Sequence, residues 1–145
     1  MTELTLALAD TIADAALAKG AELGTLPLTV AVLDAGGHVK VMKRADGSGI
    51  LRCEIAYGKA WGALGMGLPS RALAARAAKM PAFFTAIAAA SEGRIIPVPG
   101  GVLVRDAEGR LLGAVGISGD TSDVDEVCAV AGIEAAGLKP DTEER

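Results

Sequence analysis

Three cations and a glycine-rich loop are the features of this 145-residue chain best suited to binding a ligand. Arg52 and Lys59 interrupt an apolar stretch, and helical periodicity places them along one narrow stripe. In the segment 97–101, two prolines restrict the backbone and two glycines leave N–H groups free to face an oxygen atom. The predicted site for an anionic small molecule comprises Arg44, Arg52, Lys59, Pro99, Gly100 and Gly101. The alternative is an ordinary loop, with the cations at a solvated helix edge.

Two single residues could carry chemistry. Lys59 could act as a base or nucleophile if burial lowers its pKa, and such an amine would suit an enzyme acting on a small carboxylate. His38 is the only histidine, so any metal bound through imidazole must use it. A solvated side chain on a strand is the other interpretation of His38.

Other patterns argue against common classes of enzyme. Ser118 follows Gly116 at the spacing of a nucleophile elbow, but that motif needs a second glycine where Asp120 stands. We therefore do not expect a serine hydrolase. The glycines spaced by three before Asp120 match neither a phosphate-binding loop nor a dinucleotide fingerprint, and close packing explains them. Cys53 and Cys128 lack the spacing of a zinc site, and we expect two buried free thiols.

Composition limits the possible partners. Hydrophobic residues make up 51% of the chain and aromatics 3%, which indicates a folded core of Ala, Val, Leu and Ile. The net charge of −4 lacks the basic excess that binds nucleic acid. No apolar run is long enough to cross a membrane, and the N-terminus has no basic leader. We therefore expect a cytoplasmic protein with neither a nucleic-acid nor a membrane partner.

The elements that must position these residues follow from periodicity and turn residues. We expect helices over about 3–19, 50–64, 70–79, 81–91 and 122–138, and strands over 28–35, 38–44, 94–96, 102–105 and 110–118. Ser70 is expected to cap the third helix, and the core stripe of the last helix is expected to be Val124, Val127, Cys128, Ala131, Ala135 and Leu138. Short connections make neighbouring strands antiparallel.

The chain is predicted to form a single domain over residues 1–138, followed by a polar tail, 139–145, that is loose or docked on a partner. Its fold class is α/β, of the α+β kind, with helices packed on an antiparallel sheet. The helix predicted over 50–64 is apolar nearly all round. A chain this small has limited interior in which to bury such a helix, so we expect a homo-oligomer.

Several short motifs occur in an order and spacing typical of one protein family. They are Asp34-Ala35-Gly36-Gly37-His38, Lys59-Ala60, Pro69-Ser70-Arg71-Ala72-Leu73, Pro99-Gly100-Gly101 and Asp125-Glu126 followed by Cys128-Ala129. None is diagnostic alone, but together they extend over nearly the whole chain. The chain thus resembles the GlcG/HbpS family, which includes the C-terminal domains of PduO-type proteins.

This resemblance implies a profilin-like fold with a five-stranded antiparallel sheet, homo-oligomeric assembly and, for some members, binding of haem or a related tetrapyrrole. His38 would be the metal ligand if haem binds, and few aromatic side chains are present to pack a porphyrin. Three functions stay open at this point: a haem- or small-molecule-binding accessory protein, an enzyme acting on a small organic acid, and a structural oligomer without a ligand.

Overall fold

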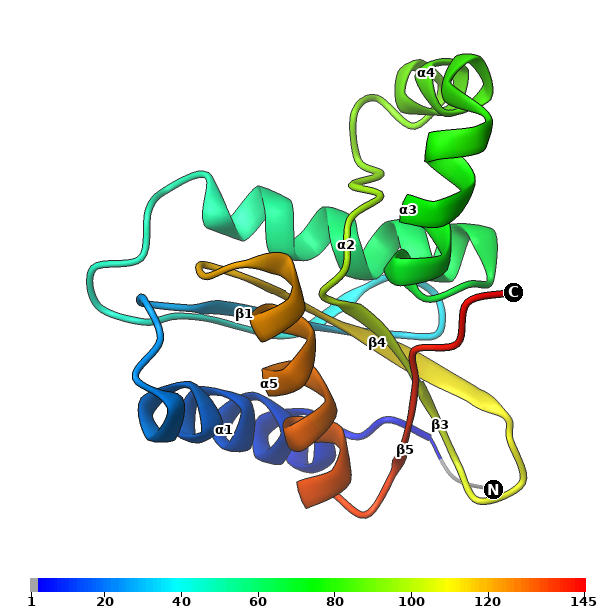
Figure 1. The fold of residues 1–145 in the computed structure, drawn as a ribbon. Coiled ribbons are helices and arrows are strands. Elements are labelled where there is room, and N and C mark those ends of the chain that lie inside the picture. The colour runs from blue at the N-terminus through cyan, green and yellow to red at the C-terminus, as the bar shows by residue number, and fades with distance from the viewer. Residues whose placement is uncertain (1–2) are drawn as a thin grey trace.

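The computed structural model describes residues 3–145 and shows helices on both faces of a central sheet (Figure 1). In chain order the elements are α1 Leu6–Leu23, β1 Thr29–Asp34, β2 Val39–Arg44, α2 Arg52–Met66, α3 Ser70–Lys79, α4 Pro81–Ala90, β3 Gly101–Arg105, β4 Leu111–Ser118, α5 Ser122–Ala135 and β5 Lys139–Asp141. None of the helices in this described range is long and apolar enough to span a bilayer.

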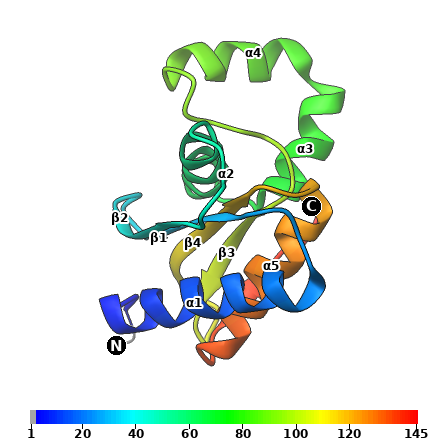
Figure 2. The ribbon, with the colours of Figure 1, turned by 90° about the vertical axis from the view of Figure 1, so that its left-hand side faces the viewer.

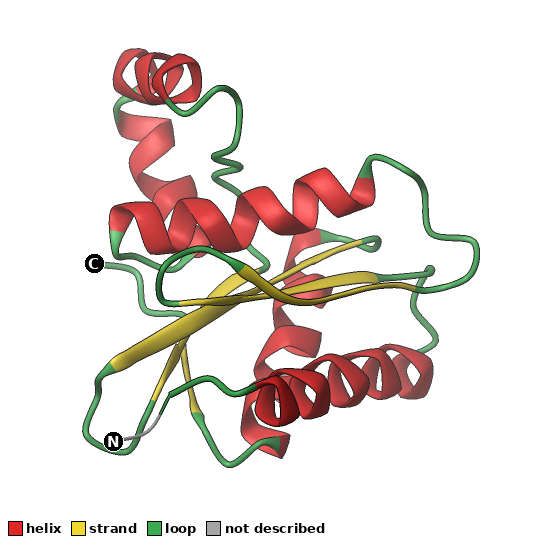
Figure 3. Cartoon of the chain, turned by 180° about the vertical axis from the view of Figure 1, so that it is seen from behind, coloured by secondary structure: helices red, strands yellow, loops and turns green. Residues whose placement is uncertain are grey.

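The five strands form one sheet in the order β2-β1-β4-β3-β5, and every neighbouring pair is antiparallel (Figure 3). The predicted fold class, with a five-stranded antiparallel sheet flanked by helices, is therefore confirmed. The two predicted hairpins, β1 with β2 and β3 with β4, are present. Short turns make these pairings, as expected from the spacing of the strands.

Alternation along the strands divides the core between the two faces of the sheet. Val30 and Val32 point to the larger core, which α1 and α5 cover, whereas Leu33 and Leu103 point to the smaller core beneath α2. A view along α2 shows it on one side of the sheet, with α1 and α5 on the other and α4 beyond α2 (Figure 2). The site predicted on α2 consequently lies on the α2 face.

The strand predicted over Arg94–Ile96 is absent, and this prediction was wrong. The segment instead runs along the outer side of α2, where the N–H of Ile96 donates to the carbonyl of Gly58 at 3.2 Å. A Cβ on Gly58 would lie 2.4 Å from Cγ1 of Ile96, so only glycine allows this approach. We call residues 94–97 the strap. It covers part of the apolar helix α2 with the protein's own chain.

The fifth strand lies where we expected a polar tail that is loose or docked on a partner. Lys139–Asp141 forms β5 and pairs with β3, with Leu103 opposite Asp141. The Asp141 carboxylate accepts hydrogen bonds from Arg105 Nε and Arg145 Nη2, each at 2.9 Å. These charged contacts hold the end of the chain against the sheet.

Two details of the helices also differ from the predictions. Pro69, not Ser70, is the N-cap of α3, because the Ser70 hydroxyl is directed to Gly101. The buried side of α5 consists of Asp125, Cys128, Ala129, Gly132 and Ile133, whereas the predicted core residue Val127 is 47% exposed. A small rotation of the stripe about α5 thus brings a carboxylate into the interior.

Candidate functional site

Lys59 forms a buried ion pair with Asp125. Its Nζ lies 3.2 Å from Oδ2 of Asp125 and donates to the carbonyl of Ile117 at 2.9 Å, and the two side chains are 3% and 1% exposed. The other oxygen of Asp125 accepts the backbone N–H of Asp120 at 3.0 Å. The pair therefore joins α2 to α5 around the end of the sheet.

Burial shifts the pKa of each partner toward its neutral form. Loss of hydration lowers the pKa of Lys59, although the nearby charge of Asp125 opposes the shift. Loss of hydration likewise raises the pKa of Asp125, against the effect of Lys59. A lowered pKa is what a reactive amine requires, but this Nζ already has a carboxylate and a carbonyl as partners. The arrangement favours a structural role for Lys59.

The structure brings Gly100 and Gly101 directly against Lys59. Gly100 has a φ of +120°, and a Cβ there would lie 2.8 Å from Lys59 Nζ. A Cβ on Gly101 would lie 2.3 Å from the Lys59 carbonyl oxygen, and the Gly101 N–H donates to the Ser70 hydroxyl at 2.7 Å. The two glycines allow close packing here, and the Gly101 N–H we expected to face a ligand is used within the protein.

Arg44 and Arg52 lie on the same face near a group of hydroxyls that sequence reasoning missed. Arg52 Nη1 donates to Ser118 Oγ at 3.1 Å, and Arg44 Nη1 donates to the Ser48 carbonyl at 2.7 Å. Thr29 stands opposite both Arg44 and Ser118 in the sheet, and its hydroxyl lies 2.8 Å from that of Ser48. The only signal in the sequence was a polar residue at a terminus of three strands: Thr29 begins β1, Arg44 ends β2 and Ser118 ends β4.

Neither guanidinium has a carboxylate within 4.0 Å among residues 3–145. Arg52 is half-buried and Arg44 is exposed. Two cations without a counter-ion at one end of the sheet could bind an oxyanion, because a guanidinium offers a planar fork of N–H donors.

His38 lies far from these cations. It precedes β2 and Arg44 ends β2, so the two residues are six steps apart along an extended chain, a distance of about 20 Å. The imidazole is 82% exposed, and its Nδ1 lies 3.4 Å from Oδ1 of Asp34. The predicted residues thus divide into two groups, with Arg44, Arg52, Lys59 and the glycine loop at one end of β2 and His38 at the other.

The carboxylate beside His38 is held firmly. Asp34 Oδ1 accepts the backbone N–H groups of Gly36 and His38, each at 3.0 Å. Burial raises the pKa of Asp34, but these hydrogen bonds and the neighbouring imidazole outweigh it and leave the pKa below its usual value. A fixed, ionised carboxylate at Nδ1 favours the tautomer that leaves Nε2 free to bind a metal.

His38 borders a surface hollow of about 310 Å³. Leu4 and Leu112 give it an apolar part, and Lys40, two residues along from His38, adds a cation. Its lining residues are Glu3, Leu4, Asp34, Ala35, Gly36, His38, Lys40 and Leu112. The hollow thus offers an exposed imidazole and one cation beside the carboxylates of Glu3 and Asp34, and its two leucines are only 4% and 6% exposed.

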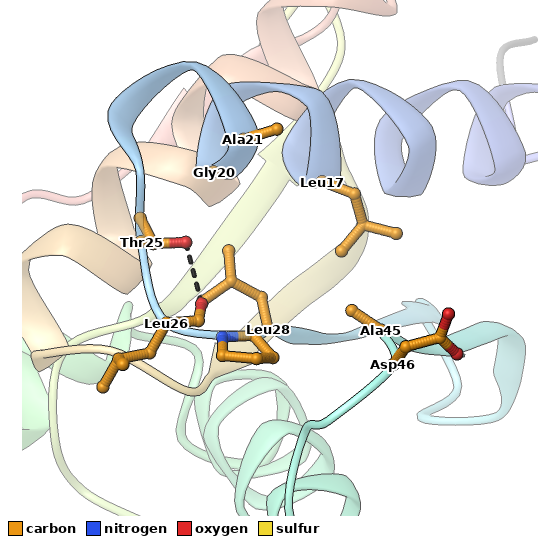
Figure 4. Close-up of a pocket in the computed structure, with 9 residues that line it drawn as sticks. Leu17, Gly20, Ala21, Thr25, Leu26, Leu28, Ala45 and Asp46 are labelled. Carbon is orange, nitrogen blue, oxygen red and sulfur yellow. Dashed lines mark hydrogen bonds between the residues drawn. The ribbon is translucent and has the colours of Figure 1, made fainter.

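A second hollow, of about 240 Å³, lies between α1 and the start of β1 (Figure 4). Leu17, Leu28 and Ala45 line it, and Asp46 is the one charged residue at its edge. Thr25 uses its hydroxyl to bind the Leu26 carbonyl at 2.8 Å. None of the predicted site residues lines this hollow, so it gives no support to the predicted anion site.

Comparison with known proteins identifies the family. The model of the family described as "haem degrading protein HbpS-like" matches residues 4–134. A 15.0 kDa protein from the dhaT-dhaS intergenic region of Citrobacter freundii is 30% identical over 131 residues, which are 90% of each chain.

Solved structures share the fold. A PduOC:haem complex has a TM-score of 0.85 at 24% identity, covering 97% of this chain and 100% of that one. An HbpS double mutant from Streptomyces reticuli has a TM-score of 0.78 at 32% identity, covering 92% and 87%. Since the family match extends over most of the chain, this protein belongs to the HbpS-like family.

Proposed function

We propose that this protein is a haem-binding accessory protein and that His38 supplies an imidazole to the iron. Membership of a family described by haem degradation supports a tetrapyrrole ligand. A complex with haem is known for a protein of the same fold. The observation that carries the proposal is the exposed His38 ring, oriented by Asp34 beside a surface hollow.

The residues around His38 fit the parts of a haem. Nε2 of an imidazole whose Nδ1 faces a carboxylate is a good ligand for iron. Lys40 lines the same hollow as His38 and can reach a propionate, and the exposed edges of Leu4 and Leu112, 4% and 6% exposed, lie at its floor. The bound iron would supply the redox and ligand-binding chemistry of haem.

The openness of the hairpin suggests how haem would be held. The His38 side chain is 82% exposed, so this chain covers the porphyrin on one side only. Affinity depends on how much of the ligand is buried, and we therefore expect haem to exchange more readily than from an enclosed pocket. Exchange suits an accessory protein that receives haem and passes it on.

Titration of the full-length protein with haemin, followed in the Soret band, tests this proposal. We expect wild type to give a histidine-ligated spectrum and His38→Ala to lose it, with at least a tenfold weaker affinity, roughly 1.4 kcal/mol. Arg44→Gln is the matched control, because Arg44 lies at the other end of the same strand. An unchanged spectrum in His38→Ala would assign the iron to another ligand or to surface adsorption.

The unpaired guanidinium groups of Arg44 and Arg52 favour a second candidate, the binding of a small carboxylate. Both cations lie beside buried hydroxyls and lack a carboxylate partner in the described chain. Lys59 lies close to Arg52, but Asp125 balances its charge, and Gly100 and Gly101 pack against it. We propose that an anion would contact the two arginines directly. The glycine loop would contribute only by packing against Lys59 and holding it in place.

Calorimetry with acetate and succinate tests the anion site. We expect Arg52→Gln to weaken binding about tenfold, because it removes a charged, half-buried donor. Arg110→Gln is the control, since Arg110 is an exposed cation paired with Asp106. Equal binding by wild type and Arg52→Gln would remove the carboxylate site while leaving the haem proposal at His38 untouched.

A further inference from the structure

The hollow between α1 and the start of β1 takes no part in the two sites proposed above, and its inner walls are apolar (Figure 4). Leu28 lies at its base and is 2% exposed, and Leu17 and Ala45 line its sides. We call this space the α1 hollow. Its volume is about 240 Å³, and at about 30 Å³ for each water-sized group it holds roughly eight non-hydrogen atoms. A ligand of this hollow is therefore far smaller than a tetrapyrrole.

Two carboxylates without a cationic partner lie around the α1 hollow. Asp46 is exposed at its edge, beside Ala45 (Figure 4). Asp120 lies just outside, where its Oδ2 accepts the backbone N–H of the lining residue Leu26 at 2.9 Å. Neither carboxylate forms an ion pair with another of residues 3–145. The rim of the hollow is consequently negative.

Helix α1 ends at the hollow and adds to the same negative field. The carbonyl end of a helix favours a cation, yet the last turn of this 18-residue helix has no basic residue. The cations of the adjacent strand β2 are engaged elsewhere. Lys43 pairs with Asp10 at 2.8 Å and Asp14 at 2.6 Å, and Arg44 donates to the Ser48 carbonyl. The hollow thus combines apolar walls with uncompensated negative charge at its rim.

Three other kinds of cation fit the α1 hollow less well. Ca²⁺ and Mg²⁺ take about six oxygen ligands, and residues 3–145 hold no group of three or more His, Cys, Asp or Glu side chains able to bind a metal. Quaternary ammonium groups are bound by aromatic rings, and none lines the hollow. A lysine of another protein would enter with its ammonium first and place the charge against Leu28, away from Asp46.

We propose that the α1 hollow binds a small linear primary alkylamine as its ammonium ion. The alkyl tail lies against Leu17 and Leu28, and the ammonium group stays at the rim, where its three N–H donors face the Asp46 carboxylate and water. Such an amine is ionised at pH 7, as lysine is. Because the ligand is small and the site is open, we expect a dissociation constant of about 1 mM.

Titration of the full-length ¹⁵N-labelled protein with pentylammonium chloride at constant ionic strength tests the site. The amide signals of residues 20–28 and 45–46 should shift. Asp46→Asn should weaken binding about fivefold, and Ala21→Leu, which fills the hollow from its exposed rim, should weaken it at least about tenfold. Glu92→Gln is the matched control, because Glu92 is an exposed carboxylate beyond α4. The spectra themselves show whether each variant is folded.

Two further ligands separate the contributions of charge and tail. Pentanol has the same tail without the charge, and propylamine has the charge on a shorter tail; each should bind about fivefold more weakly than pentylamine. Pentanol binding as tightly as pentylamine, Asp46→Asn binding as tightly as wild type, or Ala21→Leu without effect would overturn the proposal. Equal shifts with methylammonium would also overturn it, because they would show attraction to a surface charge alone.

Discussion

At the scale of single residues, the ion pair of Lys59 and Asp125 makes each partner costly to replace alone. Lys59→Met leaves a carboxylate in the interior, where 1% of its side chain is exposed. We expect a loss of about 3 to 5 kcal/mol in the free energy of unfolding at pH 7. The double variant Lys59→Met with Asp125→Asn should recover part of it, because the uncharged amide still accepts the N–H of Asp120.

Urea denaturation measures the free energy of unfolding of both variants, and its dependence on pH provides a further check. The cost of Lys59→Met should shrink as the pH falls, because burial raises the pKa of Asp125 and protonation then removes the unpaired charge. Wild-type stability in Lys59→Met at pH 7 would mean that the pair is not buried as described.

Sequence reasoning at this scale found the cations and the glycines but not their partners. Lys59 was expected beside Gly100 and Gly101, and the structure places it there. Asp125 is 66 residues away, within the helix predicted over 122–138, and was not among the core residues predicted for that helix. Its burial depends on how α5 is rotated against the sheet, and the small apolar residues of α5 allow more than one rotation. Periodicity therefore could not identify the ion pair.

At the scale of elements, the short strand β5 depends on charged contacts. Hydrogen bonds from Arg145, opposed by burial and reinforced by Arg105, lower the pKa of Asp141 to about 2 from 3.8. Because the folded pKa is depressed, the stabilisation is complete above about pH 4 and is lost as the pH falls through about 2. Asp141→Asn should therefore lose about 2 kcal/mol at pH 7 and show a smaller loss near pH 2.

Thermal unfolding of Asp141→Asn across this range checks the prediction, with Glu143→Gln as the control at a side chain that is 80% exposed. A destabilisation that stays the same from pH 7 to pH 2 would contradict the assigned role of Asp141.

The helices and the two hairpins could be predicted because local periodicity and turn residues determine them. The strap and β5 could not. The strap has the β-branched pair Ile95 and Ile96, typical of a strand, but its backbone bonds to α2. Strand β5 has three residues with a proline in the middle, and its pairing rests on contacts with Arg105 and Arg145. In both cases a distant contact overrides a weak local pattern.

At the scale of the whole molecule, the candidate residues lie at opposite ends of one strand. His38 and its hollow are about 20 Å from Arg44, so one haem bound to a single chain cannot use both. The anion candidates and the haem candidate are therefore proposed as separate sites.

The location of haem is tested most directly by NMR of the ¹⁵N-labelled protein with haemin. Ferric iron broadens the signals of nearby amides, so binding at His38 should broaden residues 34–40 together with Leu4 and Leu112. The amides of Arg44 and Arg52 should stay sharp, and His38→Ala should remove the broadening. Broadening centred on Arg44 and Arg52, or broadening around residues 34–40 that persists in His38→Ala, would contradict the proposal that His38 binds the iron.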